Sequence, residues 1–393
     1  MLLGLVGKPS CGKSTFFKAA TLADVLIASY PFATIKPNHG IGYVRVKALC
    51  DELGVKCNPR TGFCDGNTRF VPVDLMDVAG LVEGASEGKG LGNQFLDDLR
   101  QADVFIHIVD ASGTTNAEGQ EGDGDPVVDI KMLERELDKW YVGIFKRVWP
   151  KLSKGLQSTK SDVAKAISKQ FSGLRVGESD VESVILKLGL DSGQISYWSE
   201  EDLFKFASAL RHLTKPMVVV ANKIDKGNAK ENLERIKSEF KDLFVIPCSA
   251  DSELSLRQAG KAGLIEYTPG SSDFVVNEDK VNEQQKEALE FIRKNVLNVY
   301  GSTGVQDVLD KAVFDLLKYV AIYPAGARLS DSKGNILPDC FLLKGGSTAL
   351  DFAYSLHTDI GDKFVKAIDV RTKMAVGRDH VLKHCDGVEI MTS

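Results

Sequence analysis

The sequence of 393 residues has no long hydrophobic run, no excess of basic residues and no even set of cysteines. A membrane helix needs about 20 consecutive apolar residues, and no stretch approaches that length. The net charge is −5, which excludes a uniformly basic nucleic-acid coat but leaves room for a local basic patch. Seven cysteines in a chain this long do not form a disulfide framework, so we expect a reducing, cytoplasmic setting.

What remains is the composition of a globular protein, with 43% hydrophobic and 26% charged residues. At about 150 residues per domain, the length predicts two or three domains. A strand-like pattern already begins at Leu2, so we expect no signal or transit peptide.

The first strong motif is the glycine-rich stretch Gly7-Lys8-Pro9-Ser10-Cys11-Gly12-Lys13-Ser14-Thr15. It fits G-x-x-x-x-G-K-[ST] at every fixed position, follows an apolar strand at 2–6 and precedes a helical pattern. The glycines let backbone N–H groups turn toward a phosphate, and the helix start adds its positive dipole end. We therefore expect this loop to bind a nucleotide, with Lys13 at the β- and γ-phosphates and the Ser14 hydroxyl on Mg²⁺.

Two later segments predict the base of that nucleotide, namely Asn222-Lys223-Ile224-Asp225 and Ser249-Ala250. Each follows an apolar strand, and doubly wound sheets bind ligands at the carboxyl ends of their strands. The Asp225 carboxylate can accept two hydrogen bonds from guanine, whereas adenine lacks those donors. Asn222 would touch the base edge and Lys223 would lie over the base. A backbone N–H at 249–250 would donate to guanine O6.

The D-x-x-G pattern from Asp77 to Gly80 ends the apolar stretch 70–76. We expect Asp77 to hold Mg²⁺ through water and the Gly80 N–H to sense the γ-phosphate. Thr34 lies in a loop after the first helix and is a candidate second Mg²⁺ ligand, with a plain loop threonine as the alternative. The candidate metal ligands are Ser14, Thr34 and Asp77, and the candidate catalytic residues are Lys13, Thr34 and Gly80.

These motifs resemble the Obg-related YchF family of P-loop GTPases and ATPases. The resemblance rests on the phosphate loop, on Y-P-F-A-T-I-K-P-N from Tyr30 to Asn38, and on the twenty-residue segment from Asp77 to Leu96. The stretch from Asp351 to Gly361 is similar to the signature of a TGS domain, a small β-grasp module. The resemblance covers residues 1–110, about 215–270 and about 305–393.

The fold class that follows is α/β: a doubly wound P-loop GTPase sheet with an inserted helical subdomain and a C-terminal β-grasp domain. We assign residues 1–126 and 206–304 to the G domain, 127–205 to the helical insertion and 305–393 to the TGS domain. Apolar residues recur mostly at three- and four-residue steps between Val128 and Val148, which predicts an amphipathic helix. A docking arm and a structural lid are both open roles for this insertion.

The chain departs from related proteins at positions that bear on hydrolysis. Leu81 stands where Ras-like proteins carry the glutamine that orients water, and YchF relatives share this change, so we expect slow hydrolysis. Typical YchF proteins carry N-x-x-E in place of N-K-x-D, so we predict GTP first and ATP second. Residues 111–126 contain no histidine, so the histidine mechanism of bacterial members does not carry over. Ser10 replaces an asparagine linked to K⁺ dependence, which speaks against a K⁺ requirement.

The resemblance implies a GTP-binding and hydrolysing switch that acts on the ribosome or translation through its TGS domain and helical insertion. An ATPase of the YchF type and a ribosome- or RNA-binding adaptor with little hydrolysis are the alternatives. Scattered basic residues in the last domain predict an RNA-facing patch or a solvated face equally well. We expect a cytoplasmic monomer that binds GTP and Mg²⁺ and does not bind membranes.

The cysteines and one histidine raise separate questions. Cys50, Cys57 and Cys64 are spaced seven apart, which is not a standard zinc spacing, so free thiols are the leading interpretation over a metal or redox site. Cys11 lies at a helix start, where a lowered thiol pKa would make it reactive. We expect His357, inside the TGS motif, to cap or pack and not to catalyse.

Overall fold

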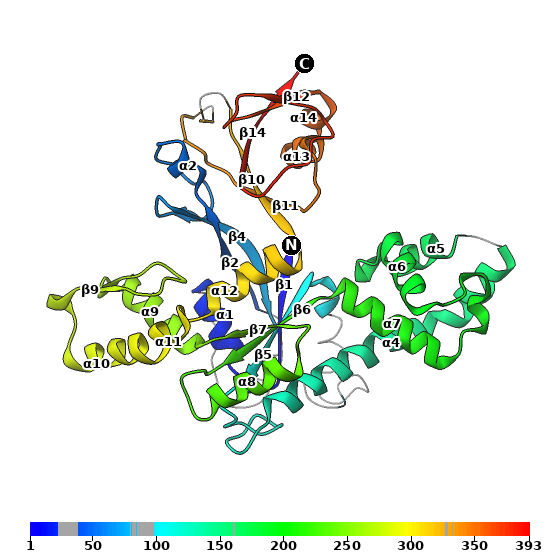
Figure 1. Cartoon of the computed structure of the whole chain (residues 1–393), viewed down its shortest axis with the longest axis horizontal. Helices are drawn as coiled ribbons and strands as arrows, with labels where there is room; N and C mark the ends of the chain where they lie inside the picture. The colour runs from blue at the N-terminus through cyan, green and yellow to red at the C-terminus, as the bar shows by residue number, and fades with distance from the viewer. Residues whose placement is uncertain are drawn as a thin grey trace. The chain divides into compact units, whose positions relative to one another are not determined.

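A computed structural model describes residues 1–22, 38–78, 80, 84, 98–159, 162–326, 329–331 and 333–393. By packing, the chain divides into two compact units (Figure 1). The first contains residues 1–40 and 74–308, and the second contains residues 41–73 and 309–393. Segment 41–73, which we predicted as part of the G domain, therefore packs with C-terminal residues. The functional division into three domains stays a prediction.

The main sheet, as far as the structure describes it, has the strand order β2-β4-β1-β5-β6-β7, and β3 pairs with β4. Its strands are β1 (Leu2–Val6), β2 (Asn38–Lys47), β3 (Phe63–Cys64), β4 (Thr68–Asp77), β5 (Val104–Asp110), β6 (Met217–Asn222) and β7 (Phe244–Pro247). β1 pairs in parallel with β4 and β5, and β6 pairs in parallel with β5 and β7. These parallel strands confirm the predicted α/β class.

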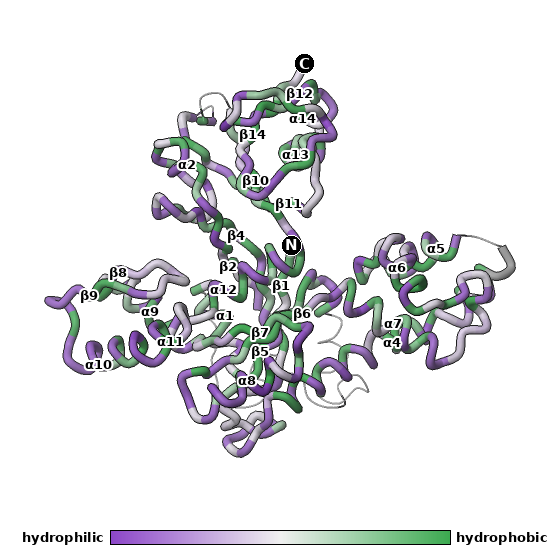
Figure 2. The backbone as a smooth tube through the Cα atoms, in the orientation of Figure 1, coloured by the Kyte–Doolittle hydropathy of each residue, from purple (hydrophilic) through white to green (hydrophobic). Residues whose placement is uncertain are grey.

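The register of the parallel strands sets where the site forms. Leu5 lies opposite Asp77, and Asp110 lies opposite Asn222. Because parallel strands end at the same edge, Asp77, Asp110 and Asn222 share the carboxyl edge of the sheet. Strands β5 and β6 are buried along their whole length, and Figure 2 shows the hydrophobic colouring that follows these central strands.

The helices of the first unit connect the strands and build the insertion. They are α1 (Lys13–Thr21), α4 (Pro126–Thr159), α5 (Val163–Gln170), α6 (Glu178–Leu188), α7 (Glu200–Thr214), α8 (Ala229–Glu239), α9 (Ala250–Lys261), α10 (Glu283–Ile292), α11 (Asn298–Tyr300) and the start of α12 (Val305–Asp310). Helices α4 to α7 gather into one group (Figure 1). Its core contains Phe145, which stacks on Phe171 with 3.8 Å between ring centroids. The predicted helical insertion is confirmed. The short strands β8 (Ile265–Glu266) and β9 (Val275–Val276) form a separate pair.

The second unit contains a mixed sheet in the order β11-β10-β14-β12-β13 among the described residues. Its elements are α2 (Leu49–Glu52), β10 (Tyr319–Pro324), β11 (Phe341–Lys344), α13 (Ala349–Leu356), α14 (Thr358–Asp362), β12 (Phe364–Asp369), β13 (Ala375–Val376) and β14 (Asp386–Thr392). Phe352 of α13 is buried in one cluster with Ile322 and Val388 of the sheet, the helix-on-sheet packing of the predicted β-grasp domain. His357 accepts a hydrogen bond from the Asp359 N–H at 3.2 Å, so its predicted capping role is confirmed.

Segment 41–73 is tied to the C-terminal part of the second unit by a buried arginine. Arg69 is 2% exposed, and its guanidinium donates to the carbonyl oxygens of Leu337 at 3.2 Å and Pro338 at 2.8 Å. Arg45 adds an ion pair to Asp310 at 2.7 Å. Across the described ranges, no helix combines the length and the apolar composition that a membrane crossing requires.

Candidate functional site

The loop between β1 and α1 has the backbone that the phosphate-binding motif requires. Gly7 and Gly12 have φ angles of 148° and 100°, a region that L side chains avoid. A Cβ on Gly7 would lie 2.3 Å from the Ile108 carbonyl oxygen, and one on Gly12 would lie 2.2 Å from Asn222 Nδ2. Both glycines are therefore required by conformation and by space. They turn the loop into a concave row of N–H groups at the start of α1.

Lys13 and Ser14 begin α1 and face different partners. The Lys13 side chain folds back over the loop, where Nζ donates to the Lys8 carbonyl oxygen at 2.8 Å. The Ser14 hydroxyl donates to Asp77 Oδ2 at 2.8 Å, and Thr15 continues the helix. The structure thus brings the end of β4 to the start of α1, as the predicted metal ligands Ser14 and Asp77 require.

The environment of Asp77 fits a cation. The residue is fully buried, and burial raises the pKa of its carboxyl, while Lys13 and the Ser14 hydroxyl lower it in part. Asp77 Oδ1 has no hydrogen-bond partner among the described residues. A buried carboxylate oxygen beside a hydroxyl is the hard oxygen pair that Mg²⁺ prefers. These two residues could hold such an ion.

Asn222 joins three segments at the carboxyl edge of the sheet. Its side chain is buried, its Nδ2 donates to the Cys11 carbonyl oxygen at 2.9 Å, and its Oδ1 accepts from the Ala250 N–H at 3.1 Å. Ser249 caps α9, because its hydroxyl accepts from the Ser252 N–H. Asn222 therefore braces the phosphate loop and the start of α9. We expected a backbone N–H at 249–250 to serve guanine O6. In this structure the Ala250 N–H donates to the Asn222 amide and the Ser249 N–H donates to the Thr303 carbonyl oxygen at 2.9 Å.

Lys223 and Asp225 follow Asn222 in a tight turn. Lys223 has a φ angle of 60°, and its Nζ pairs with Asp110 Oδ2 at 2.8 Å. The turn is held by the Ile224 N–H, which donates to the Cys248 carbonyl oxygen at 3.1 Å. The Asp225 Oδ1 atom is buried and has no hydrogen-bond partner in the described ranges. Its carboxylate is thus placed to receive a donor from a ligand.

Asp110, at the end of β5, is a candidate site residue that the motifs did not reveal. Its carboxylate accepts hydrogen bonds from the Ser112 hydroxyl at 2.5 Å and the Thr115 hydroxyl at 2.7 Å, besides the ion pair with Lys223. Burial acts to raise the pKa of Asp110, but these hydrogen bonds outweigh it and hold the pKa below its ordinary value. Asp110 thereby fixes Lys223 on the side of the site where the base is expected.

Lys8 was predicted as a member of the phosphate loop, but its partners were not, because the motif treats its position as variable. Lys8 is 2% exposed, and its Nζ lies 2.8 Å from Asp129 Oδ2 and 2.6 Å from the Thr115 carbonyl oxygen. Asp129 belongs to the first turn of α4. The phosphate loop is therefore joined to the loop after β5 and to the helical insertion.

Two glycines complete the wall of the phosphate loop at Pro9. A Cβ on Gly80 would lie 2.9 Å from the Pro9 backbone nitrogen, and one on Gly119 would lie 2.8 Å from its carbonyl oxygen. Gly80, the predicted γ-phosphate sensor, therefore does lie against the phosphate loop. The predicted Mg²⁺ ligand Thr34 and the hydrolysis-linked Leu81 lie outside the described residues.

The structure argues against the hypothesis of a reactive Cys11. Its side chain is fully buried, and burial raises the pKa of the thiol even though Lys13, Lys223 and Lys8 act to lower it. The desolvation of a thiolate outweighs the helix start and the three cations. Cys11 is a packed thiol under the phosphate loop and not an activated one.

Comparison with known proteins agrees with this geometry. Residues 2–141 match the model of the 50S ribosome-binding GTPase family, residues 220–326 match the G4 motif-containing domain of YGR210-like Obg-like GTPases, and residues 322–392 match the TGS domain. An uncharacterized GTP-binding protein of Methanocaldococcus jannaschii is 49% identical over 396 residues, which cover 100% of this chain and 99% of that protein.

Two further proteins are also similar to this chain. The crystal structure of a GTP-binding protein from Pyrococcus horikoshii is 41% identical, covers both chains completely and superposes with a TM-score of 0.81. A protein of Mycoplasma genitalium named ribosome-binding ATPase YchF is 36% identical over 225 residues, which cover 56% of this chain and 55% of that protein. The chain belongs to the Obg-related YchF family of P-loop GTP-binding proteins and carries a C-terminal TGS domain.

Proposed function

We propose that this protein is a slow, Mg²⁺-dependent GTPase switch with a preference for guanine over adenine. The observation that carries the preference is the Asp225 carboxylate, whose buried Oδ1 has no hydrogen-bond partner among the described residues. Guanine offers this oxygen an N–H donor, whereas adenine would face it with a lone pair. When adenine binds, the buried Asp225 acceptor would stay without a donor, and such a loss discriminates strongly between the two bases.

The proposed chemistry assigns one role to each residue of the phosphate side. Lys13 would exchange the Lys8 carbonyl oxygen for the β- and γ-phosphates, and the Gly80 N–H would contact the γ-phosphate. Ser14 and Asp77, joined at 2.8 Å, would hold Mg²⁺ together with Thr34. Bound Mg²⁺ neutralises charge on the phosphates.

Hydrolysis should be slow without a partner. The position after the D-x-x-G motif is Leu81, and a hydrocarbon side chain cannot orient an attacking water. We propose that an effector supplies or orders the missing group. The long lifetime of the GTP-bound state then suits a switch better than a metabolic hydrolase.

We propose the ribosome as that effector, in the cytoplasm. The support is the printed name of the Mycoplasma relative, a ribosome-binding ATPase, together with the matches to a 50S ribosome-binding GTPase model and to a TGS domain. Basic side chains of the second unit, among them Lys363, Lys366 and Lys373, would contribute RNA contacts.

A competition titration with GTP, ATP and xanthosine triphosphate tests the base preference. GTP should outcompete ATP, and Asp225→Asn should weaken GTP binding by about 10- to 100-fold, the loss of a charged hydrogen bond, while favouring the xanthine nucleotide. Asp242→Asn, at an exposed carboxylate, is the matched control and should change nothing. Equal affinity of the parent protein for GTP and ATP would refute the guanine assignment.

Co-sedimentation with ribosomes tests the switch. The protein should sediment with ribosomes in the presence of a non-hydrolysable GTP analogue and less with GDP. Lys13→Ala should lose nucleotide binding and the difference between the two nucleotides. Sedimentation that is equal with GTP analogue, GDP and no nucleotide would identify an adaptor and not a switch.

A further inference from the structure

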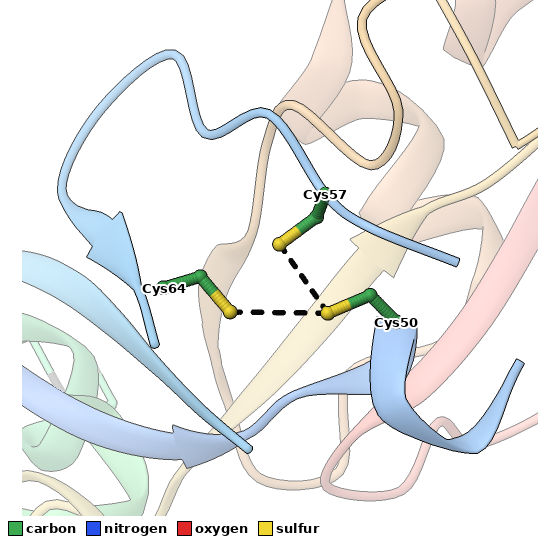
Figure 3. A group of neighbouring side chains, drawn as sticks. All are labelled: Cys50, Cys57 and Cys64. Carbon is green, nitrogen blue, oxygen red and sulfur yellow. Dashed lines mark hydrogen bonds between the residues drawn. The ribbon is translucent and has the colours of Figure 1, made fainter. Parts of the chain in front are cut away.

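Three cysteine side chains of the second unit converge on one point (Figure 3). Cys50 lies in α2, Cys57 lies in the following loop and Cys64 lies in β3. The Cys50 Sγ atom is 3.3 Å from Cys57 Sγ and 3.8 Å from Cys64 Sγ, and all three sulfur atoms lie within 4.8 Å of one another. The chain thus gathers thiols from three separate local structures.

The sulfur separations match one tetrahedral ion. Zinc binds thiolates at about 2.3 Å, which places neighbouring sulfur atoms of a tetrahedral site about 3.8 Å apart. The three cysteines already lie close to that spacing. A cluster of several irons would need its thiolates spread around a larger body. A Cys50–Cys57 disulfide would use two of the three thiols and would not explain why Cys64 Sγ lies 3.8 Å from Cys50 Sγ.

The segment that carries these thiols lacks a core of its own. No residue from 51 to 67 is buried, and the structure describes all of them. It is anchored by backbone hydrogen bonds from Asn58 to the Ile336 carbonyl oxygen at 2.8 Å and from Arg60 to the Pro338 carbonyl oxygen at 2.9 Å, by ion pairs of Arg60, and by the pairing of β3 with β4. Short segments without a hydrophobic core commonly depend on a metal or a disulfide for order.

We infer that Cys50, Cys57 and Cys64 bind one Zn²⁺ ion as a three-thiolate site, which fastens segment 51–67 within the second unit. Among the described residues, the group of neighbouring metal-ligating side chains consists of these three cysteines, so water or another small ligand would take the fourth position. The spacing C-x6-C-x6-C is not a standard zinc motif. Here the three ligands come from a helical turn, a loop and a strand, and the fold brings them together. The site is independent of nucleotide binding, and its failure would leave the proposed GTPase function untouched.

The test begins with the full-length protein, purified with a phosphine reductant and no chelator. Elemental analysis should find about one zinc per chain. After removal of zinc, titration with Co²⁺ in excess Mg²⁺ should give the thiolate charge-transfer band and the ligand-field bands of tetrahedral cobalt. Excess Mg²⁺ keeps Co²⁺ away from the oxygen ligands of the nucleotide site.

Variants identify the ligands. Cys57→Ser should lower Co²⁺ affinity by at least about tenfold and weaken the charge-transfer band, and Cys340→Ser, a free thiol of the same unit, should keep both. GTP binding by each variant reports that the first unit remains folded. A parent protein with no zinc and no cobalt band would overturn the inference. So would an unchanged band in the triple serine variant, or a Cys50–Cys57 disulfide in the reduced preparation.

Discussion

Replacing Asn222 with alanine would remove two hydrogen bonds from the centre of the nucleotide site. The first runs from Nδ2 to the Cys11 carbonyl oxygen at 2.9 Å, and the second runs from the Ala250 N–H to Oδ1 at 3.1 Å. Both partners belong to buried residues, so each is left without compensation from water. A buried polar group that loses its partner costs about 1–3 kcal/mol, so the loss of two partners should lower the unfolding free energy by about 2–6 kcal/mol.

The same change should weaken GTP binding, because Asn222 holds the phosphate loop at Cys11, next to Gly12. We expect a loss of at least about tenfold in affinity, equal to about 1.4 kcal/mol. Within the usual range of about 5–15 kcal/mol, a domain with more than about 6 kcal/mol of stability stays folded after this loss, and its affinity remains measurable. Urea unfolding of the nucleotide-free protein and titration with a fluorescent GTP analogue give the two quantities.

Asn232→Ala is the matched control for Asn222→Ala. Asn232 is also a buried asparagine, and its Nδ2 donates to the Ala111 carbonyl oxygen at 2.9 Å, but it does not hold the phosphate loop. This variant should lose stability and keep its GTP affinity. If both variants lose stability and Asn222→Ala still binds GTP like the parent protein, Asn222 is a packing residue and the bracing role is refuted.

Two further predictions concern the phosphate loop and the sheet beneath it. Gly12→Ala should abolish GTP binding, because its Cβ would lie 2.2 Å from Asn222 Nδ2, whereas Gly143→Ala, with no atom within 4 Å of its Cβ, should bind GTP normally in the same titration. Burial lowers the pKa of His107 from 6.5 to about 3, so below pH 6.5 the unfolded chain takes up a proton that the folded chain does not. As the pH decreases below 6.5, the free energy of unfolding of the parent should therefore decrease more steeply than that of His107→Leu, by up to about 1.4 kcal/mol per pH unit. Equal slopes of the two proteins in urea unfolding between pH 6.5 and about 5 would contradict this.

Sequence reasoning could predict which segments meet at the candidate nucleotide site, because each of them carries a local motif. The phosphate loop, Asp77 and Asn222 each follow a strand, and parallel pairing brings the ends of these strands to one edge. The family and the α/β class follow from the same motifs and are confirmed. The roles assigned to Thr34 and Leu81 lie outside the described residues and stay predictions.

The partners of the motif residues could not be predicted, because they are distant in sequence and carry no pattern. Lys8 contacts Asp129 and Thr115, which lie more than a hundred positions away, and Asp110 becomes the partner of Lys223 only once β5 and β6 pair. Segment 41–73 poses the same problem on a larger scale. A strand pattern shows that a face is buried but not which part of the chain covers it, and here Arg69 binds carbonyl groups near residue 338.

The contact between Lys8 and Asp129 suggests how the phosphate loop and the helical insertion are coupled. The side chains of the two residues are 2% and 10% exposed, and their charged atoms lie 2.8 Å apart. Removing one partner of a buried ion pair costs about 3–5 kcal/mol, because the other charge stays buried without compensation. Lys8→Met should therefore reduce the free energy of unfolding by about that amount.

Replacing both partners separates the ion pair from the rest of the fold. Apolar substitution of a whole buried pair is often neutral, so Lys8→Met with Asp129→Leu should be more stable in urea than Lys8→Met alone. If the pair also carries a signal, the double variant should bind GTP yet lose any difference between GDP and GTP in the hydrogen exchange of α4. Additive losses of stability would refute the coupling, because residues that act as a pair cannot fail independently.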